Sequence, residues 1–125
     1  MATAVVDASA VAAIVFAEPD GDRVVERLAG ADLAAPSLLP YEVANVAALR
    51  VRRGLLSGRA AATAISIFER LGIGLHDADP ADLLPLAAAT GLTAYDASYL
   101  WLARALGADL VTLDRRLRMA FLGTG

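Results

Sequence analysis

The sequence predicts an α/β fold with a mainly parallel sheet and helices on both of its faces. Short apolar runs alternate along the chain with longer segments whose apolar residues recur at helical spacing. No internal repeat, linker or low-complexity tract divides the 125 residues, and that length is enough to bury one core. We therefore expect one domain over residues 1–125.

Four short apolar segments, bounded by polar, proline or glycine residues, are predicted to form the strands. The first runs into Asp7, the second is stopped by Pro36, and the last runs into Asp114. The predicted strands are residues 3–6, 32–35, 73–75 and 109–113.

Capping residues and helix breakers mark seven helices between and after these strands. Ser9 opens the first helix, and Thr93 opens the sixth. Ser37 is expected to cap the long third helix, which tolerates Pro40 in its first turn and closes at Gly54. The predicted helices are residues 9–17, 22–29, 37–53, 58–71, 79–90, 93–106 and 115–119.

The composition excludes several classes of protein. Cysteine is absent, which removes disulfides, thiolate metal sites and cysteine nucleophiles. All eleven basic residues are arginine, so a P-loop, which needs a lysine for its phosphates, is excluded. The net charge of −3 argues against a general nucleic-acid coat protein, but not against an enzyme that meets nucleic acid through a metal-loaded acidic pocket.

Hydrophobic residues make up 58% of the chain, yet no stretch approaches the roughly 20 consecutive apolar residues that span a membrane. The longest apolar stretch, residues 8–17, follows Asp7 and has no basic segment before it, unlike a signal peptide. We therefore expect no membrane association and a cytoplasmic location. The apolar surplus also suggests an exposed apolar face that a partner covers.

Four acidic residues fall at strand ends or helix starts, where a parallel α/β sheet binds its ligands. Asp7 and Asp114 follow the first and last strands, and Glu42 lies in the first turns of the long helix after the second strand. Asp96 follows no strand of its own. It reaches this edge only if its helix packs antiparallel to the usual direction or enters from the side.

Each of these acids also has a purely structural interpretation. Thr93 and Asp96 fit a capping box. Asp7 and Asp114 fit simple N-caps, and Glu42 suits the positive end of a helix dipole. When clustered, however, two carboxylates about 5 Å apart repel by roughly 3 kcal/mol at an effective dielectric of about 20. Four together would take up protons or bind Mg²⁺ or Mn²⁺, and such cations can hold a phosphodiester and activate water.

Other polar and aromatic residues have weaker functional interpretations. Arg115 and Arg116 directly follow Asp114 and are candidates for contact with phosphate. The dense acidic cluster at residues 77–82 matches the start of a helix. Trp101 is expected in a core or in a dimer seam.

Four blocks of sequence carry a family resemblance. They are Val-Val-Asp7-Ala-Ser9, Tyr41-Glu42-Val-Ala-Asn45-Val, Leu-Thr93-Ala-Tyr95-Asp96-Ala-Ser98-Tyr99 and Leu-Val-Thr112-Leu-Asp114-Arg115-Arg116-Leu117. In this order and at this spacing they resemble the PIN domain and, more narrowly, the VapC toxins of bacterial type II toxin–antitoxin systems. The resemblance spans residues 5–117, nearly the whole chain.

The resemblance implies a three-layer α/β/α sandwich that cleaves RNA, usually as a homodimer, and that a cognate antitoxin silences. It implies that Ser9 and Thr112 are hydroxyls that orient the acids or the metal waters. Asn45, three residues after Glu42 on the same helical face, would help to position it. The family commonly continues into a further short strand, for which residues 121–122 are barely long enough. The implied acidic tetrad, which coordinates Mg²⁺ or Mn²⁺, is Asp7, Glu42, Asp96 and Asp114.

The sequence therefore favours a Mg²⁺- or Mn²⁺-dependent endoribonuclease that acts as a toxin. One alternative is a catalytically silent PIN-like module that binds protein or RNA. Another is a metal-dependent phosphatase or DNA-acting nuclease, which shares the chemistry and differs only in substrate. The sequence contains no recognisable motif for binding a base or a 2′-hydroxyl, so it does not predict which RNA is the target. The identity of the antitoxin is not predicted either.

Overall fold

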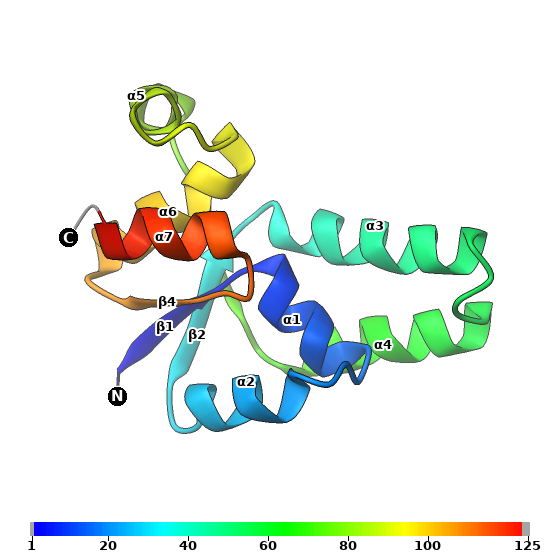
Figure 1. The fold of residues 1–125 in the computed structure, drawn as a ribbon. Coiled ribbons are helices and arrows are strands. Elements are labelled where there is room, and N and C mark those ends of the chain that lie inside the picture. The colour runs from blue at the N-terminus through cyan, green and yellow to red at the C-terminus, as the bar shows by residue number, and fades with distance from the viewer. Residues whose placement is uncertain (1, 124–125) are drawn as a thin grey trace.

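Residues 2–123 are described by a computed structural model, in which four strands and seven helices alternate along the chain (Figure 1). The strands are β1 (Thr3–Val6), β2 (Asp32–Pro36), β3 (Gly74–His76) and β4 (Asp109–Val111). The helices are α1 (Ala8–Val15), α2 (Gly21–Leu28), α3 (Leu39–Arg52), α4 (Gly58–Arg70), α5 (Pro80–Thr90), α6 (Ala94–Leu106) and α7 (Arg115–Gly123). The predicted α/β class is confirmed.

The strands form one parallel sheet in the order β3-β2-β1-β4. β1 lies inside the sheet, where Val5 pairs with Ala34 on one side and with Leu110 on the other. The chain moves from β1 to β2 and β3 in one direction, and then returns across the sheet to β4. Because such crossovers are right-handed, this reversal places two sets of helices on opposite faces of the sheet.

The helices complete the three-layer α/β/α sandwich that the resemblance implied. α6 packs against β1, β2 and β4, and α5 packs on its outer side. α2 packs against α1 and β4. α3 and α4 run side by side away from the sheet as an arm that projects from the body (Figure 1).

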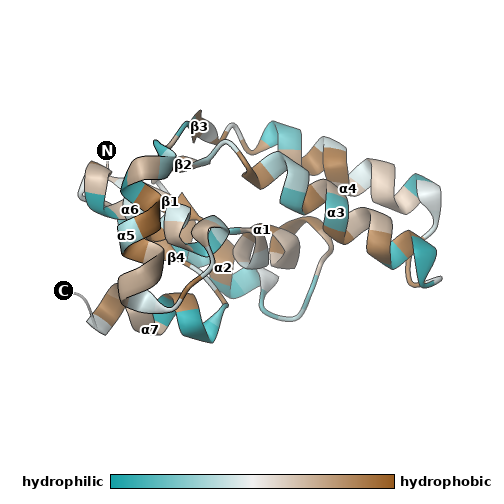
Figure 2. Ribbon diagram, turned by 90° about the horizontal axis from the view of Figure 1, so that it is seen from above, coloured by the Kyte–Doolittle hydropathy of each residue, from teal (hydrophilic) through white to brown (hydrophobic). Residues whose placement is uncertain are grey.

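The core consists mainly of alanine, valine and leucine, as a chain with only 6% aromatic residues requires. Figure 2 shows hydrophobic segments gathered in the body of the molecule around β1 and α6. Tyr99 on α6 is the largest of the fully buried side chains. None of the helices in residues 2–123 has both the length and the apolar continuity needed to cross a membrane.

The starts of the first and third helices differ from the prediction. α1 begins at Ala8 instead of Ser9, and Asp7 is its N-cap, as in its structural interpretation, because the Asp7 carboxylate accepts a hydrogen bond from the Ala10 N–H at 3.0 Å. α3 begins at Leu39 and has no side-chain cap, so Ser37 is not its N-cap. The Ser37 N–H instead donates to the His76 carbonyl and extends the pairing of β2 with β3.

Several strand boundaries also differ from the prediction. β2 includes Pro36, where the prediction ended the strand, and β3 begins and ends one residue later than predicted. β4 ends at Val111, two residues earlier than predicted, because its partner strand β1 ends at Val6 and the chain turns into α1. Residues 121–122 lie in α7, so they do not form the further strand that was considered for them.

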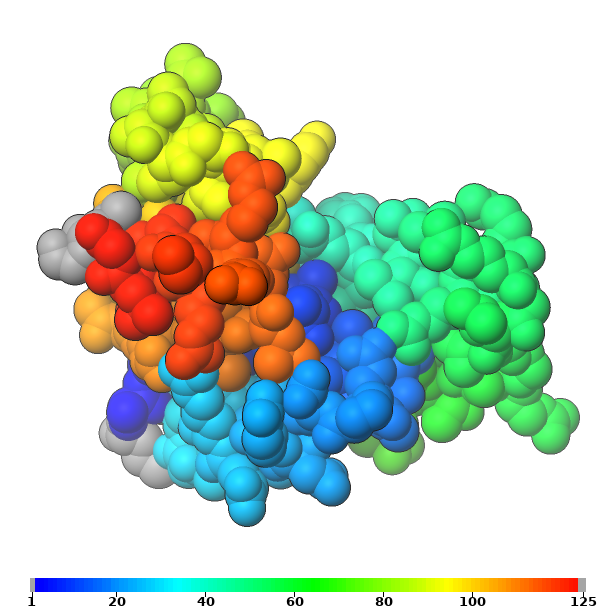
Figure 3. Space-filling view, viewed as in Figure 1, coloured from blue at the N-terminus to red at the C-terminus, as the bar shows by residue number. Residues whose placement is uncertain are grey.

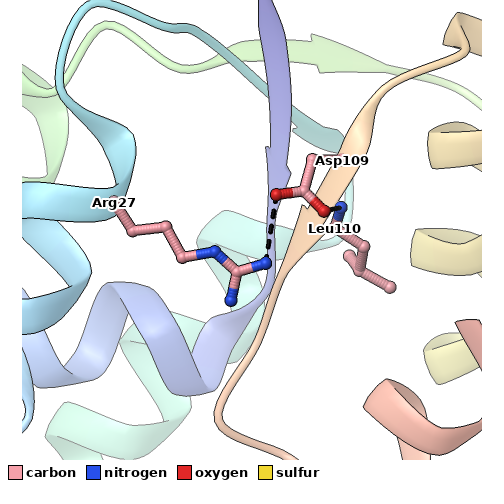
Figure 4. A network of polar contacts seen from close by, with 3 residues as sticks. All are labelled: Arg27, Asp109 and Leu110. Carbon is pink, nitrogen blue, oxygen red and sulfur yellow. Dashed lines mark hydrogen bonds and ion pairs between the residues drawn. The ribbon is translucent and has the colours of Figure 1, made fainter. Parts of the chain in front are cut away.

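An exposed ion pair joins α2 to β4 at the opposite end of the strands from the acids (Figure 4). Arg27 donates to the Asp109 Oδ2 atom at 3.0 Å, and Asp109 Oδ1 accepts from the Leu110 N–H at 2.9 Å. The two charged side chains are 40% and 50% exposed, so solvent screens the pair and its contribution is at most about 1 kcal/mol.

Candidate functional site

The four predicted acids lie at the carboxyl edge of the sheet, on four different segments. Asp7 follows β1 and Asp114 follows β4, two neighbouring strands at the point where the strand order reverses. Such a topological switch point is where open parallel sheets bind ligands. Glu42 lies in the first turn of α3, and Asp96 in the first turn of α6. In Figure 3 the starts of α1, α3, α6 and α7 adjoin at this place, in blue, cyan, yellow and orange.

The structure brings the four carboxylates within electrostatic range of one another. Asp7 interacts with Asp114 and with Glu42, and Asp96 interacts with the same two residues. These four repulsive contacts close a ring, which we call the acidic ring: Asp7, Glu42, Asp96 and Asp114. α6 leads back to the start of the parallel strand β4, so its first turn, with Asp96, lies at the carboxyl edge as in an ordinary crossover. The unusual helix direction or sideways entry expected for Asp96 is therefore not needed.

Asp7 is the most buried member of the acidic ring, with 5% of its surface exposed. Its Oδ1 accepts hydrogen bonds from the Ser9 hydroxyl at 2.7 Å and from the Ala10 N–H, and its Oδ2 accepts one from the Thr112 hydroxyl. Burial raises the pKa of Asp7 above its ordinary value, these hydrogen bonds act in the opposite direction, and the charge of Asp114 raises the pKa further. Asp7 is thus a desolvated carboxylate whose orientation is fixed.

Ser9 and Thr112 also connect the ends of β1 and β4. Their hydroxyl oxygens lie 3.3 Å apart. The Leu113 N–H donates to Ser9 Oγ, and the Asp114 N–H donates to Thr112 Oγ1, each at 2.9 Å. The two hydroxyls therefore hold the Asp7 carboxylate and the backbone next to Asp114 in one network.

Glu42 is held by a residue that the sequence analysis did not single out. The Tyr99 hydroxyl, buried on α6, donates to Glu42 Oε1 at 2.5 Å. Burial and this hydrogen bond raise the pKa of Tyr99, so the phenol keeps its proton and remains a donor. Asn45, expected to position Glu42, lies on the exposed surface beside it, and within residues 2–123 Tyr99 supplies the hydrogen bond instead.

Burial also raises the pKa of Glu42, against the hydrogen bond from Tyr99, and the charges of Asp96 and Asp7 add to this rise. The pKa of Asp96 is raised by burial and by the charge of Asp114, while Thr93 and Arg116 act in the opposite direction. Three acids in the ring therefore resist ionisation for the same two reasons, desolvation and mutual repulsion.

The N-cap interpretations of Asp7 and Asp114 are confirmed, and they are compatible with a site at the same place. Asp7 caps α1, and Asp114 Oδ1 accepts from the Leu117 N–H at 2.9 Å in the first turn of α7. Thr93 caps α6 by accepting from the Asp96 N–H. Helix capping and the clustering of the acids are therefore compatible, because each cap lies at the helix end that faces the edge of the sheet.

The two arginines after Asp114 lie beside the acidic ring. Arg116 donates to the Gly91 carbonyl at 3.0 Å, and its charge acts on Asp96. Arg115 and Arg116 line an open cleft of about 430 Å³ together with Leu92 and Met119. Both side chains are exposed, which is what contact with the phosphates of a bound strand requires.

Residues outside the ring have other partners. Asp79 accepts from the Ala81 N–H at 2.9 Å and caps α5, which confirms the structural interpretation of the acidic cluster at residues 77–82. Trp101 is half-buried and packs against the edge of the core, where it lines an open groove between α5 and α6 with Pro85 and Leu86. This position fits a packing role, whereas a dimer seam there is untested.

The donor chemistry of the acidic ring fits a hard divalent cation, because it consists of carboxylate oxygens that repel one another. Within residues 2–123, no three histidine, aspartate or glutamate side chains are close enough together to enclose a metal ion by themselves. Mg²⁺ is usually held by one or two carboxylates and keeps several of its waters. An ion at the acidic ring would therefore keep part of its water shell.

Without divalent cations, the stability of the fold is expected to fall as the pH rises above the ordinary pKa values of carboxyl groups. The raised pKa values of Asp7, Glu42 and Asp96 mean that the folded chain holds more protons than the unfolded chain just above 3.8 to 4.5. Their contribution to stability is complete below about pH 4 and is lost as the pH rises through the folded-state pKa values.

Thermal unfolding followed by circular dichroism from about pH 4 to about pH 8 measures this effect. Asp7→Asn, which removes one titrating group, should show a shallower decline than the wild-type chain. Parallel pH profiles for the two proteins would contradict the assignment of a raised pKa to Asp7.

Comparisons with known proteins identify the family. A family model of the PIN domain matches residues 4–121. The chain is 36% identical over 122 residues to Ribonuclease VapC3 of Pyrobaculum aerophilum, a match that covers 94% of this chain and 93% of that protein. The crystal structure of PAE2754 from Pyrobaculum aerophilum matches with a TM-score of 0.77 and 29% identity, over 95% of this chain and 84% of that one. The chain therefore belongs to the PIN-domain family, and its similarity to Ribonuclease VapC3 over nearly its whole length makes it a VapC-like member.

Proposed function

We propose that this chain is a Mg²⁺- or Mn²⁺-dependent endoribonuclease that serves as the toxin of a type II toxin–antitoxin pair. The acidic ring is the observation that carries the proposal. Asp7, Glu42 and Asp96 are desolvated, all four carboxylates take part in the mutual repulsion, and a divalent cation relieves that repulsion. The name of Ribonuclease VapC3 supports RNA as the substrate.

In this proposal the four acids hold the cation, and their neighbours hold the acids. When bound, the cation supplies Lewis-acid chemistry: it binds the phosphate, lowers the pKa of the attacking water and stabilises the leaving oxygen. Ser9 and Thr112 keep both oxygens of Asp7 in place. Tyr99 engages one oxygen of Glu42, and this leaves the other for the ligand.

The same site explains how an acidic protein binds an anionic strand. A bound cation would offset the negative charge of the acidic ring, and Arg115 and Arg116 at its rim would contact a flanking phosphate of the strand. The biological setting that goes with this activity is a cytoplasmic homodimer whose cognate antitoxin covers the site.

Asp96→Asn is expected to reduce RNA cleavage by more than about a hundredfold in the presence of Mg²⁺ or Mn²⁺. The loss should be this large because removing even a hydrogen-bond partner of a metal ligand lowers metal affinity or activity by about 10–100-fold. Asp77→Asn, which changes an exposed acid outside the ring, should cleave like the wild-type chain. The assay incubates each purified protein with total bacterial RNA and resolves the fragments by electrophoresis, and EDTA should stop the wild-type reaction.

The outcomes of this experiment separate the alternatives. Full cleavage by Asp96→Asn would contradict the four-carboxylate mechanism. Binding of RNA by the wild-type chain with no cleavage under any divalent cation would favour the silent binding module. For the toxin role, induced expression in a bacterial host should arrest growth with discrete RNA fragments, whereas Asp96→Asn should not.

A further inference from the structure

A cleft with two exposed tyrosines opens directly beside the acidic ring. It is lined by Leu38, Tyr41, Glu42, Asn45 and Tyr95, and its volume is about 420 Å³. Tyr41 is 79% exposed and Tyr95 is 67% exposed, so neither ring contributes to the core. The fold does not require aromatic residues at these two positions.

The two tyrosines come from different helices, and each directly precedes an acid of the ring. Tyr41 precedes Glu42 at the start of α3, and Tyr95 precedes Asp96 at the start of α6. The packing that brings Glu42 and Asp96 into electrostatic contact therefore also brings the two rings to one cleft. Glu42 lines the cleft and belongs to the acidic ring, so the two sites are continuous.

We propose that Tyr41 and Tyr95 form a stacking slot for one unpaired nucleobase of the RNA strand, next to the phosphate at the acidic ring. This inference rests on the proposed function and adds to it a subsite for the base. Exposed aromatic rings are the groups on which proteins stack single-stranded bases, and every base offers a π-face to them. The Asn45 amide in the same cleft carries a donor and an acceptor that can meet the edge of the base.

The placement of charge supports a strand of RNA as the occupant. The arginines of the site, Arg115 and Arg116, line a separate cleft with Leu92, whereas the cleft with the tyrosines has no basic residue. A strand whose phosphate lies at the acidic ring can therefore direct a base to the tyrosines and a flanking phosphate to the arginines. Because the cleft shares Glu42 with the ring, its occupant belongs to the molecule on which the ring acts.

The slot is tested by binding in an Asp7→Asn background with Mg²⁺, in which cleavage is suppressed. Fluorescence anisotropy measures the affinity for labelled octamers of adenylate and of uridylate. Tyr41→Leu and Tyr95→Leu remove a ring but keep an apolar side chain, and each should weaken binding by about tenfold. Tyr41→Phe and Tyr95→Phe keep the ring and should stay within about twofold, as should Leu55→Ala, an exposed apolar residue at the far end of the arm.

An octamer that lacks its bases but keeps its phosphates provides the second arm of the test. This octamer should bind the parent chain with both tyrosines and the two leucine variants with equal affinity, because it has no base to stack. Unchanged affinity of the leucine variants for the normal octamers would overturn the slot while the proposed function stands. A double leucine variant that changes from dimer to monomer in sedimentation would assign the cleft to a second copy of the chain and also overturn it. Failure of the wild-type chain itself to bind or cleave RNA in the presence of Mg²⁺ would instead contradict the proposed function.

Discussion

Asp7→Asn is expected to abolish RNA cleavage while leaving the metal-free protein at least as stable as the wild-type chain. Asp7 contributes a carboxylate to the acidic ring, and its replacement removes one negative charge and, in the proposed mechanism, one metal ligand. The loss of activity should exceed the 10–100-fold that is typical when the partner of a metal ligand is removed. The expected separation of activity from stability distinguishes a functional acid from a structural one.

The fold is expected to survive because asparagine can rebuild the hydrogen bonds of Asp7. Asparagine is as good an N-cap as aspartate, so Oδ1 can still accept from the Ala10 N–H. The new amide can donate to the Thr112 hydroxyl, which can then turn to Ser9 Oγ, 3.3 Å away. The change also removes a carboxyl whose pKa is raised by burial, and with it the cost of a desolvated charge.

The two properties are measured on the same preparations, by cleavage of total RNA with Mn²⁺ and by thermal unfolding in EDTA. Asp77→Asn is the matched control, since it removes the same charge from an exposed position. Cleavage at the wild-type rate would show that Asp7 is not needed for the chemistry. A large drop in the unfolding temperature of the metal-free variant would instead assign Asp7 to the structure.

Thr112→Val is expected to lower the free energy of unfolding by about 2–3 kcal/mol, and metal affinity with it by about 10–100-fold. The Thr112 hydroxyl is buried, donates to Asp7 Oδ2 and accepts from the Asp114 N–H at 2.9 Å. Valine has nearly the same shape and no polar atom, so it leaves a buried carboxylate oxygen and a backbone N–H without partners. Each unsatisfied group costs about 1–3 kcal/mol.

Urea unfolding and calorimetric titration of Mn²⁺ measure the two effects of this substitution. Thr112→Ser keeps the hydroxyl and loses one methyl group, so its free energy of unfolding should fall by only about 1 kcal/mol. Its metal affinity should remain close to that of the wild-type chain. If Thr112→Val binds Mn²⁺ as tightly as Thr112→Ser does, the hydroxyl does not support the site.

Helix ends were predictable where the capping interaction is local. Asp79 accepts from the Ala81 N–H, and Thr93 accepts from the Asp96 N–H, so each cap depends on residues within three positions. The start of α3 was not predictable in the same way. Ser37 has a good capping side chain, but its backbone N–H bonds to His76 on β3, a pairing that only the sheet creates.

The acids of the site could be located from the sequence, whereas their supports could be located only in part. Parallel α/β sheets generally bind ligands at the carboxyl ends of their strands, and this rule indicated the positions of Asp7 and Asp114. Tyr99 was missed because a tyrosine in an apolar helix has the pattern of a core residue, and its ring is indeed in the core. Its hydroxyl bonds to Glu42, which lies 57 positions away in the sequence. The expectation for Asn45 considered only the spacing along its own helix, so it could not anticipate a donor from α6.

Titration of Mn²⁺ into the metal-free chain, followed by calorimetry, tests most directly whether the four acids form one cation site. The wild-type chain should bind Mn²⁺, and Asp77→Asn should bind it equally well. Each change within the acidic ring should weaken binding by more than about tenfold: Asp7→Asn, Glu42→Gln, Asp96→Asn and Asp114→Asn. A wild-type chain that binds no Mn²⁺ at about millimolar concentration, or ring variants that bind it as the wild-type chain does, would contradict the account.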